Sequence, residues 1–129
     1  MTGDLGMDGR DARICARHDL SDGGRATRFA VEFDGRTHAA FVIAFDGVVH
    51  AYINHCPHRG TELDWQPGEV FDEFGQYLVC ATHGAAFAAD TGLCVSGPCV
   101  GSVLKKIQTS IVEDAIFLPS REGRLVRVM

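Results

Sequence analysis

The sequence of 129 residues has no long apolar run, because none approaches the length of about 18 residues that a transmembrane helix requires. Its first ten residues also lack the basic region and the apolar core of a secretory signal peptide. We therefore expect a cytoplasmic protein with no membrane partner. Thiols stay reduced in that compartment, so we interpret the five cysteines first as metal ligands or buried thiols, not as disulfides.

Basic residues are scarce in the middle of the chain. Between Thr37 and Leu104 the one basic residue is Arg59, and the segment has a net charge of −6. We expect no nucleic-acid partner, since phosphate binding needs a basic face. The acidic residues form either an ordinary solvated surface or a docking face that steers a basic partner, with residues 69–73 as the expected contact. They are Asp46, Glu62, Asp64, Glu69, Asp72, Glu73 and Asp90.

Helical periodicity is missing as well, and so is any Gly-rich nucleotide-binding fingerprint. Short β-rich runs are instead separated by Gly- and Asp-containing turns. The two strongest runs, residues 41–45 and 48–53, flank Asp46-Gly47, a pair that tolerates the positive φ angles of a type I′ hairpin turn. Further strands are expected at residues 14–20, 28–33, 77–79, 85–87, 103–112, 115–118 and 125–128.

These runs predict a single all-β domain over residues 1–129. We expect residues 1–10 to form a loose tail, because they show no apolar periodicity. Residues 11–53 and 102–129 are expected to build the base sheets. Proline, glycine, cysteine and histidine concentrate in residues 54–101, which predicts a loop-rich subdomain inserted between the two parts of the base.

Two short loops in this inserted segment each offer one cysteine and one histidine. They are Cys56-Pro57-His58-Arg59-Gly60 and Cys80-Ala81-Thr82-His83-Gly84. A [2Fe–2S] cluster can take two thiolates on one iron and two imidazoles on the other, which two such loops supply. A structural zinc site accepts the same four ligands and is the alternative. Zinc fingers usually pair Cys with Cys and His with His, whereas each loop here mixes the two.

The order of these elements closely resembles the Rieske [2Fe–2S] family over nearly the whole chain. The family begins with Cys-Pro-His-x-Gly-x-x-Leu and continues with Cys-x-x-His-Gly-x-x-Phe, a variant of Asp-x-x-Thr-Gly, and a Gly-Pro loop. In this chain the four elements stand at residues 56–63, 80–87, 90–92 and 97–98.

The resemblance implies that one Rieske [2Fe–2S] cluster is bound by Cys56, His58, Cys80 and His83. It also implies a Rieske-like fold of three stacked antiparallel sheets. The cluster would lie near the tip of the inserted subdomain, and the Gly-Pro loop would shield one side of it.

Two departures from the high-potential members of the family concern the surroundings of the cluster. Those members carry an extra cysteine in each ligand loop, where this chain has Thr61 and Thr82. They also supply Ser and Tyr hydroxyl donors to the cluster, where this chain has Ala85 and Phe87. Without those donors the reduced state is less stabilised, so we expect a reduction potential of about −150 mV.

From the resemblance we expect an electron-transfer protein, not an enzyme, with no catalytic residues and no small-molecule substrate. It would act as a ferredoxin that passes single electrons from a flavoprotein reductase to a terminal oxygenase. One alternative is a small subunit of a larger redox enzyme, resembling the small subunit of assimilatory nitrite reductase. Another is a non-redox, zinc-stabilised binding module, which metal analysis would distinguish.

The three remaining cysteines are expected to be buried thiols, because a free cysteine packs like a small hydrophobic residue. Cys94 and Cys99 flank the Gly-Pro loop, and Cys15 lies in a predicted strand. Trp65 follows the first ligand loop, and packing is its expected role, with a contribution to partner docking as the alternative.

Overall fold

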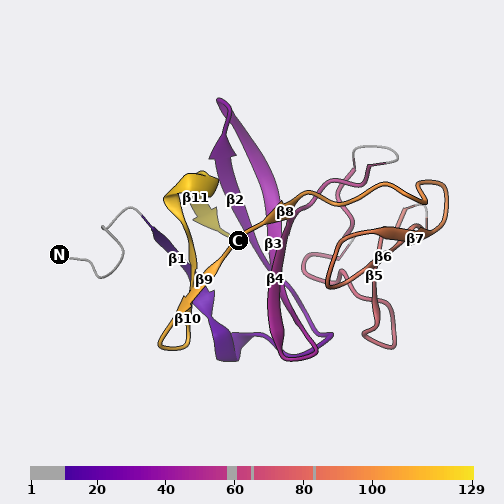
Figure 1. Cartoon of the computed structure of the whole chain (residues 1–129), viewed down its shortest axis with the longest axis horizontal. Helices are drawn as coiled ribbons and strands as arrows, with labels where there is room; N and C mark the ends of the chain where they lie inside the picture. The colour runs from indigo at the N-terminus through magenta and orange to yellow at the C-terminus, as the bar shows by residue number, and fades with distance from the viewer. Residues whose placement is uncertain (1–10, 58–60, 65, 83) are drawn as a thin grey trace.

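The computed structural model describes residues 11–57, 61–64, 66–82 and 84–129, which form three antiparallel sheets (Figure 1). The predicted all-β fold of three antiparallel sheets is thereby confirmed. Within the described ranges the helices are two single turns of 3-10 helix, η1 (Arg17–Asp19) and η2 (Ser120–Glu122). Neither is long and apolar enough to cross a membrane. The predicted tail and Trp65 lie outside the described residues.

The central sheet has five strands in the order β11-β2-β3-β4-β8. The predicted hairpin at Asp46-Gly47 is confirmed as β3 and β4, with φ angles of 52° and 78° at the two turn residues. The strand predicted near the C-terminus is also confirmed, and it pairs with β2 at the edge of the sheet. The strands are β2 (Thr27–Phe33), β3 (Arg36–Phe45), β4 (Val48–Ile53), β8 (Lys106–Ile107) and β11 (Arg124–Val128).

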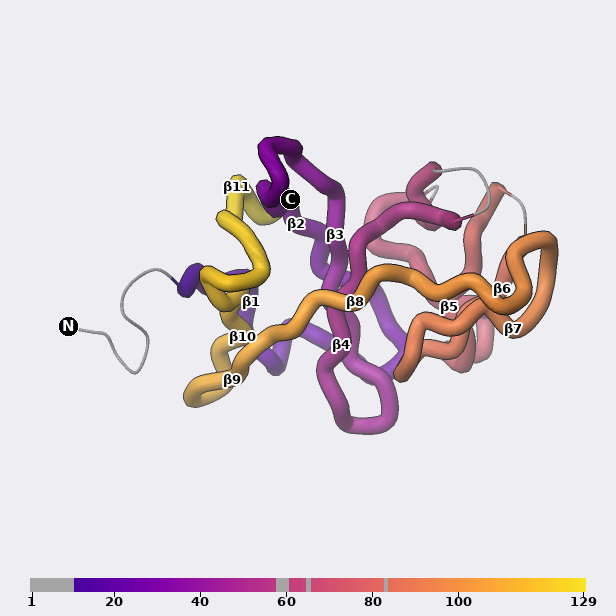
Figure 2. The backbone as a smooth tube through the Cα atoms, turned by 45° about the horizontal axis from the view of Figure 1, so that its top comes forward, coloured from indigo at the N-terminus to yellow at the C-terminus, as the bar shows by residue number. Residues whose placement is uncertain are grey.

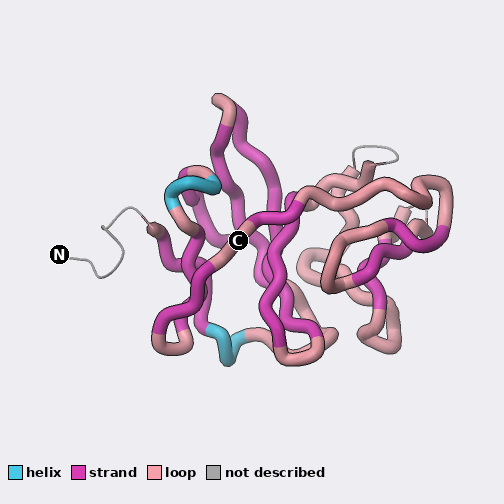
Figure 3. The backbone as a smooth tube through the Cα atoms, in the orientation of Figure 1, coloured by secondary structure: helices cyan, strands magenta, loops and turns pink. Residues whose placement is uncertain are grey.

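Two three-stranded sheets accompany the central sheet. The first has the order β1-β10-β9 and lies toward the N-terminal end of the molecule (Figure 1). The second has the order β5-β6-β7 and lies on the opposite side, among the loops that Figure 3 shows in pink. The strands are β1 (Ala12–Ala16), β5 (Tyr77–Val79), β6 (Ala86–Ala88), β7 (Cys94–Ser96), β9 (Ser110–Val112) and β10 (Ala115–Leu118).

The prediction of one strand over residues 103–112 is wrong. The segment divides into β8, which pairs with β4, and β9, which pairs with β10 in another sheet. Between them the N–H of Gln108 donates to the carboxylate of Glu122 at 3.0 Å, not to a neighbouring strand. The chain therefore changes sheets within the polar run Gln108-Thr109-Ser110, which contains no glycine or proline to mark a break.

The predicted strand over residues 14–20 also ends early. β1 stops at Ala16, whose N–H donates to the carboxylate of Asp19 at 3.1 Å. The N–H of Arg17 donates to the carbonyl of Asp114 in the β9–β10 turn at 2.6 Å. These two bonds turn the chain into η1, so the polar residues after Ala16 leave the sheet.

Alternate residues of β3 point to opposite sides of the central sheet, and both sides are buried. Phe41 and Ile43 belong to one apolar cluster, and Val42 belongs to the other. The apolar cluster shared with β1 and β10, here called the base core, contains neither Cys56 nor Cys80. Its buried members are Ile14, Cys15, Leu20, Phe29, Val31, Ala40, Val42, Ala44, Ala51, Ile53, Ile107, Ile116 and Leu118.

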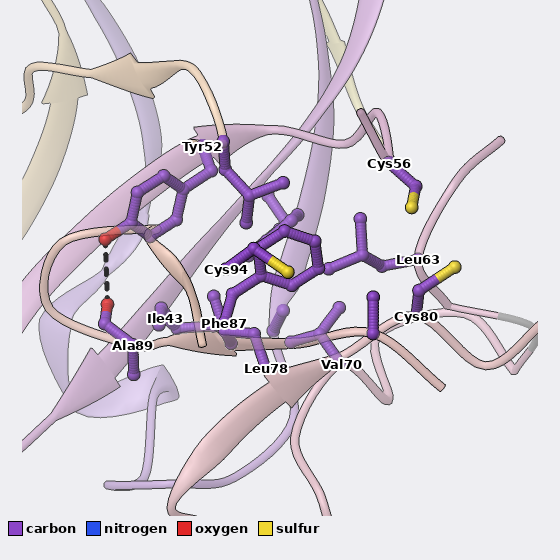
Figure 4. Close-up of a cluster of buried hydrophobic side chains, with 14 of the residues drawn as sticks. Ile43, Tyr52, Cys56, Leu63, Val70, Leu78, Cys80, Phe87, Ala89 and Cys94 are labelled. Carbon is purple, nitrogen blue, oxygen red and sulfur yellow. Dashed lines mark hydrogen bonds between the residues drawn. The ribbon is translucent and has the colours of Figure 1, made fainter. Parts of the chain in front are cut away.

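The cluster on the other face, here called the site core, joins the central sheet to β5, β6 and β7. The hydroxyl of Tyr52 in β4 donates to the carbonyl of Ala89, which follows β6, at 2.8 Å (Figure 4). Burial raises the pKa of Tyr52 well above its ordinary value, so this group remains a hydroxyl donor. The buried members are Ala26, Phe41, Ile43, Tyr52, Cys56, Leu63, Val70, Leu78, Cys80, Ala85, Phe87, Ala89, Cys94, Cys99 and Leu104.

Candidate metal centre

The two predicted cysteine ligands follow strands of two different sheets. Cys56 comes shortly after the end of β4, and Cys80 directly follows β5. Both residues are fully buried, with exposed fractions of 0%. Figure 4 shows both side chains at the same end of the site core, beyond Leu63. The fold therefore places two thiols from separate parts of the sequence at one end of one buried cluster.

The backbone closes the two cysteine loops in the same way. The N–H of Cys56 donates to the carbonyl of Thr61 at 2.7 Å. The N–H of Cys80 donates to the carbonyl of Ala85 at 2.9 Å. In each loop the bond joins the cysteine to the residue five positions later, so the two loops are matched in size.

The two predicted histidine ligands fall inside these closed loops in the sequence. His58 and His83 lie outside the described residues. Within the described part of the chain, no three His, Cys, Asp or Glu side chains gather to form a metal site. A bond from the N–H of Ala81 to the carbonyl of Leu63, at 2.9 Å, ties the second loop to the end of the first.

A buried polar network fixes the backbone on both sides of the first loop. The Oδ1 of Asn54 accepts the N–H of Leu63 at 2.7 Å, and its Nδ2 donates to the Oδ1 of Asp64 at 2.8 Å. The Oδ2 of Asp64 accepts the N–H of Gly68 at 2.8 Å and lies 3.1 Å from the Nε of Arg28. Since Asn54 precedes the loop and Leu63 follows it, this network holds the two ends together.

The network changes the interpretation of the acidic segment. Asp64 was expected among the surface or docking charges, but its side chain is fully buried and paired with Arg28. Glu62 also pairs with Arg28, and Glu69 pairs with Arg25, so both of these exposed carboxylates are partly neutralised. No sequence signal indicates that Asn54 and Asp64 form a structural pair, because isolated polar residues in a loop are usually exposed.

The Gly-Pro loop packs against the second ligand loop and brings two more thiols to the site. A Cβ added at Gly97, where φ is 96°, would lie 2.7 Å from the Cα of Ala85. Cys94 and Cys99 are buried, as expected, and their Sγ atoms are 3.0 Å apart. Burial raises the pKa of the Cys99 thiol to about 12, with added contributions from Cys94 and Cys56.

Gly97→Ala is expected to destabilise the protein more than Gly101→Ala, which is a matched control. The φ angles are 96° and 95°, so both substitutions place a side chain in the same unfavourable backbone region. At Gly101 the added Cβ meets nothing within 4 Å, whereas at Gly97 it meets the backbone of the second ligand loop.

The difference between the two variants isolates that contact, and we expect it to be about 1–3 kcal/mol. Urea unfolding monitored by tryptophan fluorescence measures it. Equal losses of stability in the two variants would show that the close contact with Ala85 does not affect the free energy of unfolding.

The described residues fit one half of a [2Fe–2S] site. Thiolates are soft ligands that suit iron–sulfur clusters, and Cys56 and Cys80 provide two of them in a water-excluded place. The five cysteines are all unbridged, so neither of these thiols is committed to a disulfide. The two remaining ligands would come from two histidines, one in each loop. Both loops are closed by a backbone hydrogen bond between residues five positions apart.

Comparisons with known proteins agree with this arrangement. The family model described as the Rieske [2Fe-2S] domain matches residues 11–113. No curated protein matches the sequence. Among solved structures, a ferredoxin of Sphingomonas yanoikuyae B1 is 24% identical, with a TM-score of 0.64, and the match covers 85% of this chain and 98% of that one. The ferredoxin of carbazole 1,9a-dioxygenase from Nocardioides aromaticivorans IC177 is 22% identical, with a TM-score of 0.63 and coverage of 86% and 98%.

A longer chain gives a similar structural match. It belongs to a complex of a carbazole-bound oxygenase variant with the ferredoxin of carbazole 1,9a-dioxygenase. The identity is 16%, the TM-score is 0.68, and the match covers 84% of this chain. This protein spans 28% of the length of that chain. At these identities the structural matches establish the shared fold, and the family model spans most of the sequence. The chain belongs to the Rieske [2Fe–2S] domain family, whose cofactor is one [2Fe–2S] cluster.

Proposed function

We propose that this protein is a Rieske ferredoxin, which carries single electrons from a flavoprotein reductase to a terminal oxygenase in the cytoplasm. The observation that carries the proposal is the pair of matched loops, which place the fully buried Cys56 and Cys80 at one end of the site core. The likeness to two ferredoxins over 98% of their lengths supports the same role. In this role the protein transfers electrons and converts no small-molecule substrate.

We further propose that Cys56 and Cys80 hold one iron of the cluster and that His58 and His83 hold the other. When bound, the cluster supplies one-electron oxidation and reduction. The protein's own contribution is to keep both thiols away from water and to fix the first loop through Asn54 and Asp64.

The proposed cluster-binding subdomain comprises residues 54–101, inserted between base parts at residues 11–53 and 102–129. Its support is that the whole β5-β6-β7 sheet lies within it. Figure 2 shows the chain returning from this sheet to β8 in the central sheet. The subdomain is not an independent unit, because the site core includes residues of β3 and β4.

The side chains next to the second ligand loop support a low reduction potential. Ala85 and Phe87 are fully buried in the site core and carry no hydroxyl donor. A potential of about −150 mV would suit delivery of electrons to an oxygenase. Protein-film voltammetry, or redox titration at an optically transparent electrode, measures this reduction potential directly.

Reconstitution tests the carrier function. The reduced protein is mixed with a terminal Rieske oxygenase, and its reoxidation is followed by visible absorption. A free carrier is expected to elute alone in size-exclusion chromatography of a mild extract and to be reoxidised within seconds. Stable co-elution with a large redox subunit, together with failure to reduce any free oxygenase, would favour the alternative of a permanent enzyme subunit.

The acidic stretch at residues 69–73 gives a prediction about partner docking. Glu73 is exposed and precedes Phe74, which is 75% exposed at the tip of the turn before β5. Glu73→Lys is expected to slow reduction by the flavoprotein reductase roughly two- to tenfold at low salt, because steering of a basic partner weakens. The difference should shrink at high salt, where the charges are screened.

Glu113→Lys is the matched control, since it changes the net charge equally at an exposed residue of the turn between β9 and β10, in another sheet. Stopped-flow absorption measures both variants at two ionic strengths. A Glu73→Lys protein that is reduced at the unmodified rate at low salt would rule out docking at this stretch.

A further inference from the structure

The segment that runs from β7 toward β8 presents an uncharged apolar surface to solvent. Residues 91–104 contain no charged side chain, although residues 37–104 together carry a net charge of −6. Cys94 is buried in the site core, so its exposed neighbours Leu93 and Val95 point outward, because side chains alternate along an extended chain. Val103 forms an antiparallel bridge with Leu93 and therefore lies beside it on the same side. These three outward residues, Leu93, Val95 and Val103, are here called the apolar face.

A pocket of about 290 Å³ continues the apolar face toward the first ligand loop. Val103 belongs to both, since it also lines the pocket. Pro57, which directly follows the buried Cys56, lines the pocket from the loop. The ends of β2 and β4 contribute Phe33 and Ile53. The volume is at the lower limit for a ligand pocket, so it suits a single inserted group.

The pocket combines a wall of stacked rings with one full positive charge. The rings of Phe33 and His38 are stacked, with centroids 3.9 Å apart and an angle of 9° between their planes. The Nζ of Lys105 lies 5.7 Å from the centroid of the Phe33 ring. Among the described residues, no carboxylate lines the pocket and none forms an ion pair with Lys105. An unpaired cation thus stands beside apolar walls in a protein whose net charge is −5.

The apolar face indicates that a protein, and not a small molecule, occupies the pocket. A small molecule would need the pocket alone, whereas an exposed apolar surface around it is typical of contacts between proteins. The centre of such a contact is depleted of charge, and one side chain that fills a pocket often supplies much of the binding energy. A carboxylate of the partner beside that side chain would complement Lys105.

We propose that the apolar face and the pocket dock an acidic redox partner, which inserts one apolar side chain next to Lys105. This inference rests on the proposed function, because a partner seated there would contact Pro57 of the first ligand loop and so lie beside the cluster. Residues 69–73 suit a basic partner, for which the flavoprotein reductase is expected. The acidic partner would then be the terminal oxygenase, and the two partners would use surfaces of opposite charge.

Two peptides of opposite charge test the pocket directly. The probes are N-acetyl-Phe-Asp-amide and N-acetyl-Phe-Lys-amide, titrated at millimolar concentration into the isotope-labelled, oxidised holoprotein and followed by NMR. We expect chemical-shift changes at Ile53, Val103 and Lys105. The acidic peptide should bind roughly three- to tenfold more tightly than the basic one, because it pairs with Lys105 whereas the basic one is repelled.

Matched variants separate this contact from a general effect of charge or apolarity. Lys105→Glu should reverse the preference between the peptides. Arg127→Glu makes the same charge change at an exposed position of β11, on the opposite edge of the central sheet from β8, and should keep the preference. Val103→Asn should weaken binding of the acidic peptide, whereas Val48→Asn should not, although the two valines are 55% and 54% exposed.

Absence of shifts at the pocket, equal binding of the two peptides, or a preference that Lys105→Glu leaves unchanged would overturn the inference. The proposed function fails separately, since an unmodified protein without a Rieske EPR signal contradicts the cluster itself. With the cluster present, stopped-flow absorption tests the assignment of the partner. Lys105→Glu should slow reoxidation by the terminal oxygenase roughly two- to tenfold at low salt and leave reduction by the flavoprotein reductase unchanged. The opposite pattern would overturn the assignment.

Discussion

Cys80→Ala is expected to abolish cluster binding, with iron falling from about two atoms per chain to nearly none. Cys80 is fully buried at the end of the site core, and no other thiol follows β5 in the second ligand loop. The visible absorption and the EPR signal should disappear together. Metal analysis and EPR on the same sample measure the effect.

Cys15→Ala is the control, because it deletes another buried cysteine without touching the site core. This variant should keep its full iron content. The base core contains neither proposed ligand cysteine, so Cys80→Ala should keep the far-ultraviolet circular dichroism of a β protein. A folded Cys80→Ala protein that retains two irons and two sulfides would refute the assignment of this ligand.

Asp64→Ala is expected to destabilise the protein by about 3–5 kcal/mol, because it breaks a buried ion pair and leaves Arg28 with Glu62, an exposed residue, as its partner. The substitution removes the buried carboxylate beside Arg28 and also leaves the N–H of Gly68 and the amide of Asn54 without their acceptor. Because the network closes the first ligand loop, cluster loss on mild heating should also become faster. Urea unfolding and the decay of visible absorption measure the two effects.

Glu62→Ala is the matched control, since Glu62 contacts the same arginine at 2.7 Å from a position where its side chain is 48% exposed. Exposed ion pairs contribute about 0–1 kcal/mol, so this variant should remain close to the unmodified protein. Similar losses of stability in the two variants would mean that Arg28 is the stabilising group. The burial of Asp64 would then add no stability of its own.

The hairpins were the most predictable part of the fold, because their turns depend on local chemistry. Asp46-Gly47 adopts positive φ angles between β3 and β4, and Glu113 and Asp114 do so between β9 and β10. The break between β8 and β9 was not predictable, because the polar run Gln108-Thr109-Ser110 contains no glycine or proline to mark it. Which sheet a short strand joins is decided by its tertiary partners.

The candidate site also has a part that the sequence predicts and a part that it does not. Cys56 and Cys80 were identified from motif spacing, and the structure brings them to one end of a buried cluster. The contacts of Asp64 could not be predicted, because they depend on a residue distant in the sequence. Asp64 meets Arg28 of β2. A sequence pattern shows which residues can be ligands, whereas their supporting contacts require the fold.

The most direct test of a one-electron Rieske carrier is EPR of the anaerobically purified protein before and after reduction with dithionite. Iron, sulfide and zinc are assayed on the same sample. We expect a silent oxidised state and a rhombic Rieske signal after reduction, with about two irons and two sulfides per chain. A protein that stays silent and holds one zinc per chain, after controls for cluster loss, would contradict the account. The same four ligands would then form a structural site.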